Sequence, residues 1–458
     1  MEATTNSSTL DLIGNTPMVE VRHLDTGPCR LLLKLESQNP GGSIKDRIGR
    51  SMIEAAERDG RLKPGGTIVE ATAGNTGLGL ALVAALKGYR LLIIVPDKMA
   101  QEKIFHLRAL GAEVILTRSD VGKGHPDYYQ DMAERIAAER DGVYINQFGN
   151  PANPLAHETT TGPEIWEQTG HSLDAVVCGV GSGGTLTGLS RFFARVAPEV
   201  EMVLADPEGS ILAHYVETGE VSRDVGSWVI EGIGEDFLPP IADLSRVRRA
   251  YTIPDRESLE TARALLRREG ILAGSSSGTL IAGALRWCRE QTTPKTVVTF
   301  VCDSGNKYLS KMFNDYWMVD QGFIERPKTG DLRDLISRRH ADRATVTVAP
   351  DDSLLIAYGR MKLYEVSQLP VLDGTGKVVG ILDESDLLLA VVDDEARFRE
   401  PVRSAMTSRV ETLPVTASVH DLMAVFAKDH VAVVEDRDGF LGLVTRIDLI
   451  NHLRRKLK

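Results

Sequence analysis

Short apolar segments that alternate with glycine-rich turns and helical segments constrain the fold of this chain more than any other feature. Residues 67–71 form an apolar run, residues 72–77 form a glycine-rich turn, and residues 78–87 have helical periodicity. The same order returns at residues 174–196, where an apolar run leads into the glycines of residues 179–184. Strands that alternate with helices predict a mostly parallel sheet covered by helices on both faces. The sequence therefore predicts an α/β fold.

An internal repeat follows a polar, breaker-rich segment at residues 325–330. Residues 369–387 pair with residues 431–449, and each copy is typical of strand, turn, strand and helix. Neither copy is large enough to bury a good core alone, so we expect the two to pack together as one module. The expected organisation is a core of two α/β subdomains at residues 1–325, a linker at 326–340, a first repeat at 341–395 and a second repeat at 396–458.

Charge and composition exclude several classes of function. The chain has 53 Lys and Arg against 64 Asp and Glu, a net charge of −11, which disfavours nucleic acid and anionic membranes as partners. The apolar run at residues 78–86 is too short to span a bilayer, and the polar N-terminus has no leader pattern. The cysteines form no CxxC pair and the histidines show no ligand spacing, so we expect no metal site and a cytoplasmic protein.

A lysine stands at the start of a predicted helix, directly after two glycines. In the segment of residues 41–47, Lys45 precedes the helical stretch 48–58. The positive end of a helix dipole disfavours a charged amine, and the neutral amine is the nucleophile that forms a Schiff base. An ordinary exposed helix lysine is the alternative that the residues alone leave open.

Three further turns have features of ligand sites. The turn at residues 72–77 directs backbone N–H groups from a helix N-terminus, and Asn75 adds an amide. The turn at residues 179–185 fits G-x-G-x-x-G, and Asp206 ends the next strand at the spacing of a ribose-binding acid. It equally suits the phosphate of another cofactor. The serines of residues 274–278 precede a helix, where they are also ordinary N-cap residues.

Taken in order, the segments GGSIKDR, TAGNTG, GSGGT and SSSG resemble the fold type II family of pyridoxal-phosphate enzymes. Within it, the segments at residues 206–212 and 231–237 are similar to those of the cystathionine β-synthases rather than the cysteine synthases. The resemblance extends from about residue 10 to residue 318. The C-terminal repeats resemble a tandem CBS-domain, or Bateman, module, which agrees with this assignment.

The resemblance implies pyridoxal 5′-phosphate as cofactor and a tryptophan-synthase-β-like core of mostly parallel sheets. It implies that Lys45 forms the Schiff base and removes the Cα proton. Asn75 would face the ring hydroxyl oxygen, and Ser276 the pyridine nitrogen. The cofactor phosphate would be bound by Gly181, Ser182, Gly183, Gly184 and Thr185, and the substrate carboxylate by Thr72, Ala73, Thr76 and Gln147.

The implied reaction condenses L-serine with L-homocysteine to cystathionine, with hydrogen sulfide released when cysteine replaces serine. Two alternatives stay open, namely a cysteine synthase with a regulatory module and a non-catalytic nucleotide sensor. A nicotinamide-dependent dehydrogenase is less favoured, because Lys45 has no role in hydride transfer. Two residues depart from the family pattern: Ala73 stands where a serine is common, and Glu235 replaces an aromatic residue. We expect no haem, because no haem-binding segment precedes Leu10, and a homodimer or higher homo-oligomer.

The second repeat carries a motif for an adenosyl ligand. Residues 442–448 match the G-h-h-T-x-x-D pattern of CBS modules, which implies that Asp448 accepts the ribose hydroxyls and Thr445 contacts a phosphate or its equivalent. The same T-x-x-D pattern is also a helix capping box. The first repeat has Asp383 in place of the threonine, so we expect at most one competent site, in the second repeat.

Overall fold

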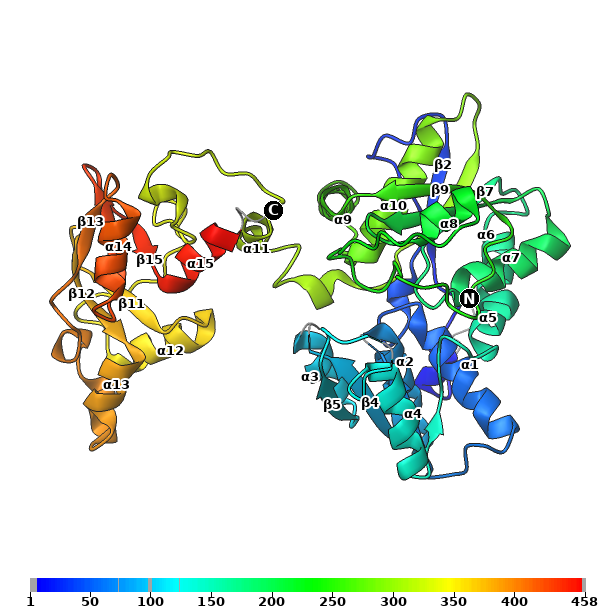
Figure 1. Ribbon diagram of the computed structural model, residues 1–458, viewed down its shortest axis with the longest axis horizontal. Coiled ribbons are helices and arrows are strands. Elements are labelled where there is room, and N and C mark those ends of the chain that lie inside the picture. The colour runs from blue at the N-terminus through cyan, green and yellow to red at the C-terminus, as the bar shows by residue number, and fades with distance from the viewer. Residues whose placement is uncertain (1–5, 73, 98–100, 123, 455–458) are drawn as a thin grey trace. The chain divides into compact units, whose positions relative to one another are not determined.

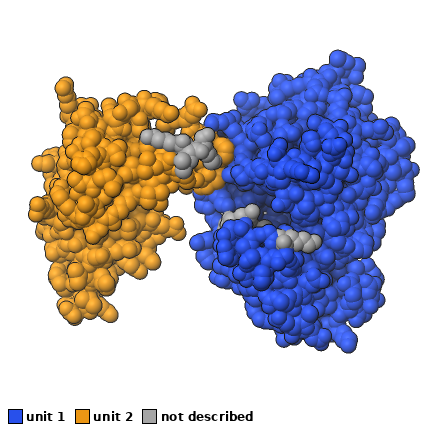
Figure 2. Space-filling view, in the orientation of Figure 1, with its two compact units in different colours: residues 1–313 blue, residues 314–458 orange. Residues whose placement is uncertain are grey.

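The computed structural model describes residues 6–72, 74–97, 101–122 and 124–454. The chain divides into two compact units, one of residues 1–313 and one of residues 314–458, which Figure 2 shows in different colours. The division lies before the boundary expected at residue 325.

The first unit contains two sheets made mainly of parallel strands (Figure 1). In the larger sheet only the edge pair β1–β2 is antiparallel. Its strands, in spatial order, are β1 Met18–Glu20, β2 Arg30–Lys34, β10 Thr296–Phe300, β7 Ala175–Cys178, β8 Glu201–Pro207 and β9 Val247–Ile253. The smaller, all-parallel sheet has the order β5 Glu113–Thr117, β4 Arg90–Pro96, β3 Thr67–Ala71 and β6 Val143–Tyr144.

The helices of this unit cover these sheets. They are α1 Lys45–Arg58, α2 Asn75–Lys87, α3 Gln101–Ala109, α4 Tyr129–Glu139, α5 Ala152–Ala156, α6 Gly162–Gln168, α7 Gly184–Val196, α8 Leu212–Thr218, α9 Asp255–Glu269 and α10 Ser275–Arg289. Shorter helical turns are η1 Thr9–Leu12, η2 Glu36–Gln38, η3 His157–Thr161 and η4 Gly305–Tyr308. The predicted strand 67–71 and the helix end at Gly88, which is left-handed, agree with the structure.

The smaller sheet is buried on both faces, as an apolar run without polar alternation predicts. All five residues of β3 are buried. Ile68 packs with α1 and α2 on one face, and Val69 packs with α4 on the other. Helices α1 and α2 cross at two glycines: a Cβ on Gly49 would lie 2.6 Å from the carbonyl carbon of Gly79. This close approach brings the first turns of α1 and α2, and therefore Lys45 and Asn75, into one region.

The second unit has a small core for each repeat. The first repeat has the hairpin β11–β12 and the second has β13–β14–β15. The elements are α11 Asp315–Asp320, η5 Leu332–Asp334, α12 Leu354–Tyr364, β11 Gln368–Leu372, β12 Val378–Asp383, α13 Glu384–Val391, η6 Glu395–Arg399, η7 Val402–Ser404, β13 Thr412–Pro414, α14 Val419–Phe426, β14 Ala432–Asp436, β15 Gly439–Val444 and α15 Arg446–Arg454.

Part of the segment expected as a linker belongs to this second core. Leu332, Leu335 and Ile336 are buried and pack with Leu422 and Val434 of the second repeat. The polar residues around them hide this role in the sequence. Within the described parts of the chain, no helix is both long and apolar enough to cross a membrane.

Candidate active site and module cavity

The predicted site segments of the first unit follow the carboxyl ends of parallel strands. Thr72 follows β3 and Asn75 begins α2, the turn at 179–183 follows β7, and Asp303 follows β10. Ligand sites of open α/β sheets lie at this end of the strands. The amide of Asn75 donates to Asp303 at 2.8 Å and so joins the end of the smaller sheet to the end of the larger one.

Lys45 is the first residue of α1, and its loop is tied to the segment after β10. The N–H of Ile44 donates to the carbonyl of Cys302 at 2.8 Å, and Ser43 forms an isolated β-bridge with Asp303. Burial lowers the pKa of the Lys45 amine, and the nearby carboxylate of Asp303 acts in the opposite direction. The direction agrees with the expectation from the sequence, and burial is its largest cause. A more neutral amine is the form that attacks a carbonyl group.

The glycines of the turn before α7 have no room for side chains. A Cβ on Gly181 would lie 2.5 Å from the carbonyl oxygen of Gly232, and one on Gly184 would lie 1.8 Å from Oδ1 of Asn153. Gly183 caps the helix with a φ of +89°. Bare backbone at a helix N-terminus is suited to a phosphate group, so this loop fits the phosphate of pyridoxal phosphate.

Two buried residues outside the glycine motif support this loop. Asn153 donates to Oγ of Ser182 at 3.0 Å, and Nε2 of His157 lies 3.2 Å from Oγ1 of Thr185. Burial lowers the pKa of His157 well below its usual value, so its ring is neutral. The contacts of Asn153 and His157 with this loop could not be read from the spacing of residues in the sequence.

The structure brings Thr76 and Gln147 together, as their shared expected role requires. Oγ1 of Thr76 donates to Oε1 of Gln147 at 2.7 Å. The N–H of Gln147 donates to buried Glu70 at 3.1 Å, and burial raises the pKa of Glu70 to about 8. Thr72 is buried in the same loop, where its hydroxyl accepts a backbone N–H at 3.2 Å. Ala73 lies outside the described residues.

The serines at the start of α10 contact two other segments, at Glu231 and at Cys302. Oγ of Ser275 accepts from the N–H of Glu231 at 3.1 Å, and Oγ of Ser277 accepts from the N–H of Cys302 at 2.9 Å. Burial raises the pKa of the Cys302 thiol to about 12, and a hydrogen bond with buried Ser276 acts in the opposite direction. Cys302 precedes the bridge between Asp303 and the lysine loop. The expected cofactor residue Ser276 therefore lies close to the segment that positions Lys45.

Asp206 does not serve as a ribose-binding acid in this structure. Its side chain is fully buried and accepts the backbone N–H of Ala213 at 2.9 Å, in the first turn of α8. Burial raises the pKa of Asp206 to about 6. The Asp206 carboxylate therefore accepts a hydrogen bond from the helix that follows β8 and is not available to bind the ribose of a dinucleotide. This removes the main support for the dehydrogenase alternative.

The second unit contains a cavity of about 450 Å³ between its two repeats. Thr445 and Asp448 line it: the N–H and Oγ1 of Thr445 donate to Oδ2 of Asp448 at 2.8 and 2.5 Å. The hydroxyl of Ser337 donates to Oδ1 of the same carboxylate. The threonine and the aspartate of the T-x-x-D motif therefore hydrogen-bond to each other at the start of α15, and both also line the cavity. In the first repeat, Asp383 and Asp386 form a reciprocal capping box.

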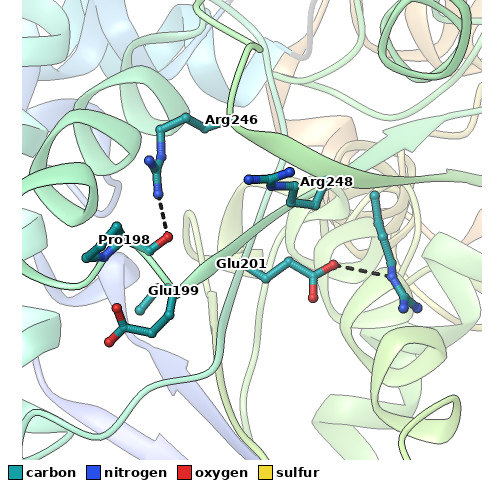
Figure 3. Close-up of a pocket in the computed structure, with 7 residues that line it drawn as sticks. Pro198, Glu199, Glu201, Arg246 and Arg248 are labelled. Atoms are coloured by element: carbon teal, nitrogen blue, oxygen red, sulfur yellow. Dashed lines mark hydrogen bonds and ion pairs between the residues drawn. The ribbon is translucent and has the colours of Figure 1, made fainter.

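A second hollow, of about 420 Å³, lies at the opposite end of the larger sheet (Figure 3). Its walls come from the start of β8 and β9, far from the carboxyl ends of the strands. Arg246 donates to the carbonyl of Pro198 at 3.0 Å, and Arg249 pairs with Glu201 at 3.3 Å. We assign it no part in the chemistry. Among the described residues, no group of three His, Cys, Asp or Glu side chains could hold a metal ion.

Comparison with known proteins agrees with this geometry. The family model for pyridoxal-phosphate-dependent enzymes matches residues 9–303, and the CBS-domain model matches residues 333–393 and 402–455. Cystathionine beta-synthase of Dictyostelium discoideum is 37% identical over 97% of this chain and 92% of its own length. The chain belongs to the cystathionine β-synthase family. Its cofactor is pyridoxal phosphate, and it is an enzyme of the pyridoxal-phosphate-dependent β-replacement type.

Other relatives show how widely this catalytic unit is used. Cystathionine beta-synthase of Saccharomyces cerevisiae is 32% identical over 99% of both chains. Cysteine synthase 1 of Emericella nidulans is 41% identical over 68% of this chain and 86% of its own. Among solved structures, O-ureido-L-serine synthase has a TM-score of 0.63 and 34% identity, and covers 69% of this chain and 100% of its own. A hydrogen sulfide-producing enzyme from Fusobacterium nucleatum has a TM-score of 0.61 and 35% identity, covering 67% and 100%.

Proposed function

We propose that this β-replacement enzyme condenses L-serine with L-homocysteine to cystathionine, and that cysteine can replace serine with release of hydrogen sulfide. The observation that carries the proposal is near-full-length similarity to proteins named cystathionine beta-synthase, which extends over 97% and 99% of this chain for two of them. The similarity to a cysteine synthase covers 68%.

The site residues divide the work of the reaction. When bound, pyridoxal phosphate supplies an electron sink for negative charge at the substrate Cα. Lys45 would hold the cofactor through its amine, and its Nζ would take the proton from the substrate Cα. The hydroxyl of Ser276 is the neutral partner of the ring nitrogen. A hydroxyl cannot hold that nitrogen protonated as a carboxylate does, which favours expulsion of the substrate's β-substituent over transamination.

The remaining assigned residues bind rather than react. The backbone of residues 181–185 holds the cofactor phosphate, with the N-terminus of α7 behind it. Thr72, Thr76 and Gln147 bind the substrate carboxylate. The hydrogen bond from Thr76 to Gln147 holds these two side chains next to each other. Ala73 belongs to the same proposed set. Asn75 faces the ring hydroxyl oxygen.

Cysteine synthase is the second candidate, favoured by the 41% identity to the Emericella nidulans enzyme. Steady-state kinetics with both substrate pairs separate the two. We expect a higher kcat/KM for serine with homocysteine than for O-acetylserine with sulfide, and the reverse order would make this chain a cysteine synthase. A visible absorption band that borohydride bleaches would exclude the non-catalytic sensor.

For the second unit we propose that the cavity between the repeats binds an adenosyl ligand. Its volume of about 450 Å³ falls within the range of small-molecule sites, roughly 300–1,000 Å³. Asp448 would accept the ribose hydroxyls, in exchange for the hydroxyl of Ser337 that it now binds. We also propose a homo-oligomer, because α12 to α15 expose large apolar side chains such as Leu363 and Leu389.

A further inference from the structure

A second buried lysine lies beside the proposed active site and has no role in the reaction described above. Lys307 belongs to η4, after β10, and is 9% exposed. Its Nζ donates to Oδ1 of Asn75 at 2.8 Å. It also lies 3.3 Å from the carbonyl of Gly42 and 3.5 Å from that of Gly41, in the loop that leads to Lys45. One ammonium group thus contacts both loops that hold the cofactor.

The two partners of Asn75 determine which way its carboxamide points. An ammonium group only donates hydrogen bonds, and an ionised carboxylate only accepts them. With Lys307 on one side and Asp303 on the other, Oδ1 of Asn75 must face the lysine and Nδ2 must face the carboxylate, at 2.8 Å each. The hydroxyl of Tyr308 donates to the same oxygen of Asp303, also at 2.8 Å, and holds that carboxylate in place.

The charges around Lys307 come from several elements. Burial lowers the pKa of its amine, Asp303 and Asp46 act in the opposite direction, and Lys103 adds to the lowering. Asp303 belongs to the segment after β10, Asp46 to α1 and Lys103 to α3. The hydrogen bond to the amide and the backbone carbonyls of the lysine loop satisfy the donors of the ammonium.

We propose that Lys307 is a positioning residue for the cofactor, because it fixes the carboxamide of Asn75 with its NH₂ end toward the ring hydroxyl oxygen. This inference rests on the role proposed for Asn75. Nδ2 has two hydrogens: one is held by Asp303, and the other is free to meet the cofactor oxygen when the cofactor is present. Without Lys307 only Asp303 holds the amide, so the carboxamide can rotate away from the orientation that presents its second N–H to the ring hydroxyl oxygen. Loss of that donor would disfavour the ionised form of the oxygen.

The visible spectrum of the bound cofactor measures this directly, because its long-wavelength band grows when the ring oxygen is ionised and its near-ultraviolet band grows when that oxygen is neutral. In Lys307→Met holoenzyme we expect the ratio of the two bands to fall about tenfold. In Lys307→Gln, which keeps an N–H donor but no charge, we expect the ratio to stay within about twofold of the parent. A matched control, Lys295→Met, removes an ammonium that binds Asp174 outside the site and should leave the spectrum unchanged.

The same spectra in an Asn75→Ala background show whether Lys307 acts through the amide. Adding Lys307→Met to Asn75→Ala should then change nothing further. A parent-like spectrum in Lys307→Met, or a second shift in the double variant, would overturn the inference. If Asn75→Ala itself has the parent spectrum, the role proposed for Asn75 fails first. Circular dichroism checks folding, and if Lys307→Met does not fold, a spectrum of Lys307→Gln that falls as far as that of Asn75→Ala overturns the inference.

Discussion

The motif residues of the first unit are organised differently from those of the second. In the first unit, Lys45 and Asn75 owe their surroundings to Asp303 and its neighbours, more than 200 residues later in the chain. In the second unit, Thr445 and Asp448 bond to each other across three residues. The difference teaches that the catalytic motif acquires its chemistry from the tertiary structure. The module motif forms its capping bonds locally and has one distant partner, Ser337, on the other oxygen of Asp448.

The largest effect should come from replacing Lys45, whose surroundings depend on the distant segment after β10. Lys45→Ala removes the amine that carries the cofactor and takes the Cα proton, so we expect turnover to fall by at least about 10³-fold. The fold should persist, because the loop is held by backbone bonds of Ile44 and Ser43. Product formation and circular dichroism test the two parts. Cystathionine synthesis close to the parent rate would contradict the assignment.

Charged groups of the two units should also differ in their contribution to stability. Arg47 is buried and pairs with Glu36 at 2.8 Å and Glu164 at 2.7 Å. Arg47→Met would leave buried Glu36 without a cationic partner and Glu164 with Lys34 alone, and should lower the free energy of unfolding by about 3–5 kcal/mol. In the module, Lys428→Met removes an exposed pair with Glu411 and should cost about 1 kcal/mol or less. Thermal unfolding of the full chain checks both, and equal effects would break the comparison.

Glu70 should make the stability of the first unit fall as pH rises. Its folded-state pKa of about 8 lies above the ordinary 4.5, so the folded state holds the proton more tightly. The resulting stability is complete below pH 4.5 and is lost as pH rises toward 8. Glu70→Gln should flatten the dependence of stability on pH, removing up to about 5 kcal/mol of change between pH 4.5 and 8. Glu164, with its pKa lowered from 4.5 to about 2, has the opposite sign: its contribution to stability is complete above pH 4.5 and is lost as pH falls toward 2. Melting temperatures against pH measure the slope, and an unchanged slope would show that Glu70 is ionised throughout.

A small effect on stability, similar to that of Lys428→Met, is expected at the T-x-x-D motif of the module. Asp448→Ala removes the acceptor for Thr445 before α15 and should cost about 1 kcal/mol of stability. Calorimetry with S-adenosylmethionine, AMP and ATP should show that whichever of them the parent binds is bound at least about tenfold more weakly. Asp386→Ala, at the capping box of the first repeat, should lose similar stability and keep ligand binding. If the Asp448→Ala variant still binds the ligand as the parent does, the T-x-x-D motif acts only as a helix cap.

Local patterns were enough for much of the fold. The apolar run 67–71 is the strand β3, Gly88 ends α2, and the segment 184–196 is the helix α7, each as periodicity and glycine placement predict. Family resemblance supplied the assignments of Lys45 and the glycine loop. In contrast, the roles of Glu70, Lys307 and His157 had no sequence signal, because each depends on partners contributed by another part of the chain.

By itself, the sequence determined the alternation of strands and helices, the repeat at the C-terminus and the identity of the residues that can react. These follow from local properties: apolar periodicity, helix termini and the chemistry of single side chains. Only the tertiary structure decided that α1 and α2 meet at Gly49 and Gly79, that the segment after β10 lies against Lys45, and that burial lowers the pKa of its amine. The reason is physical: solvent exclusion and contacts across some 200 residues exist only after the two sheets have packed.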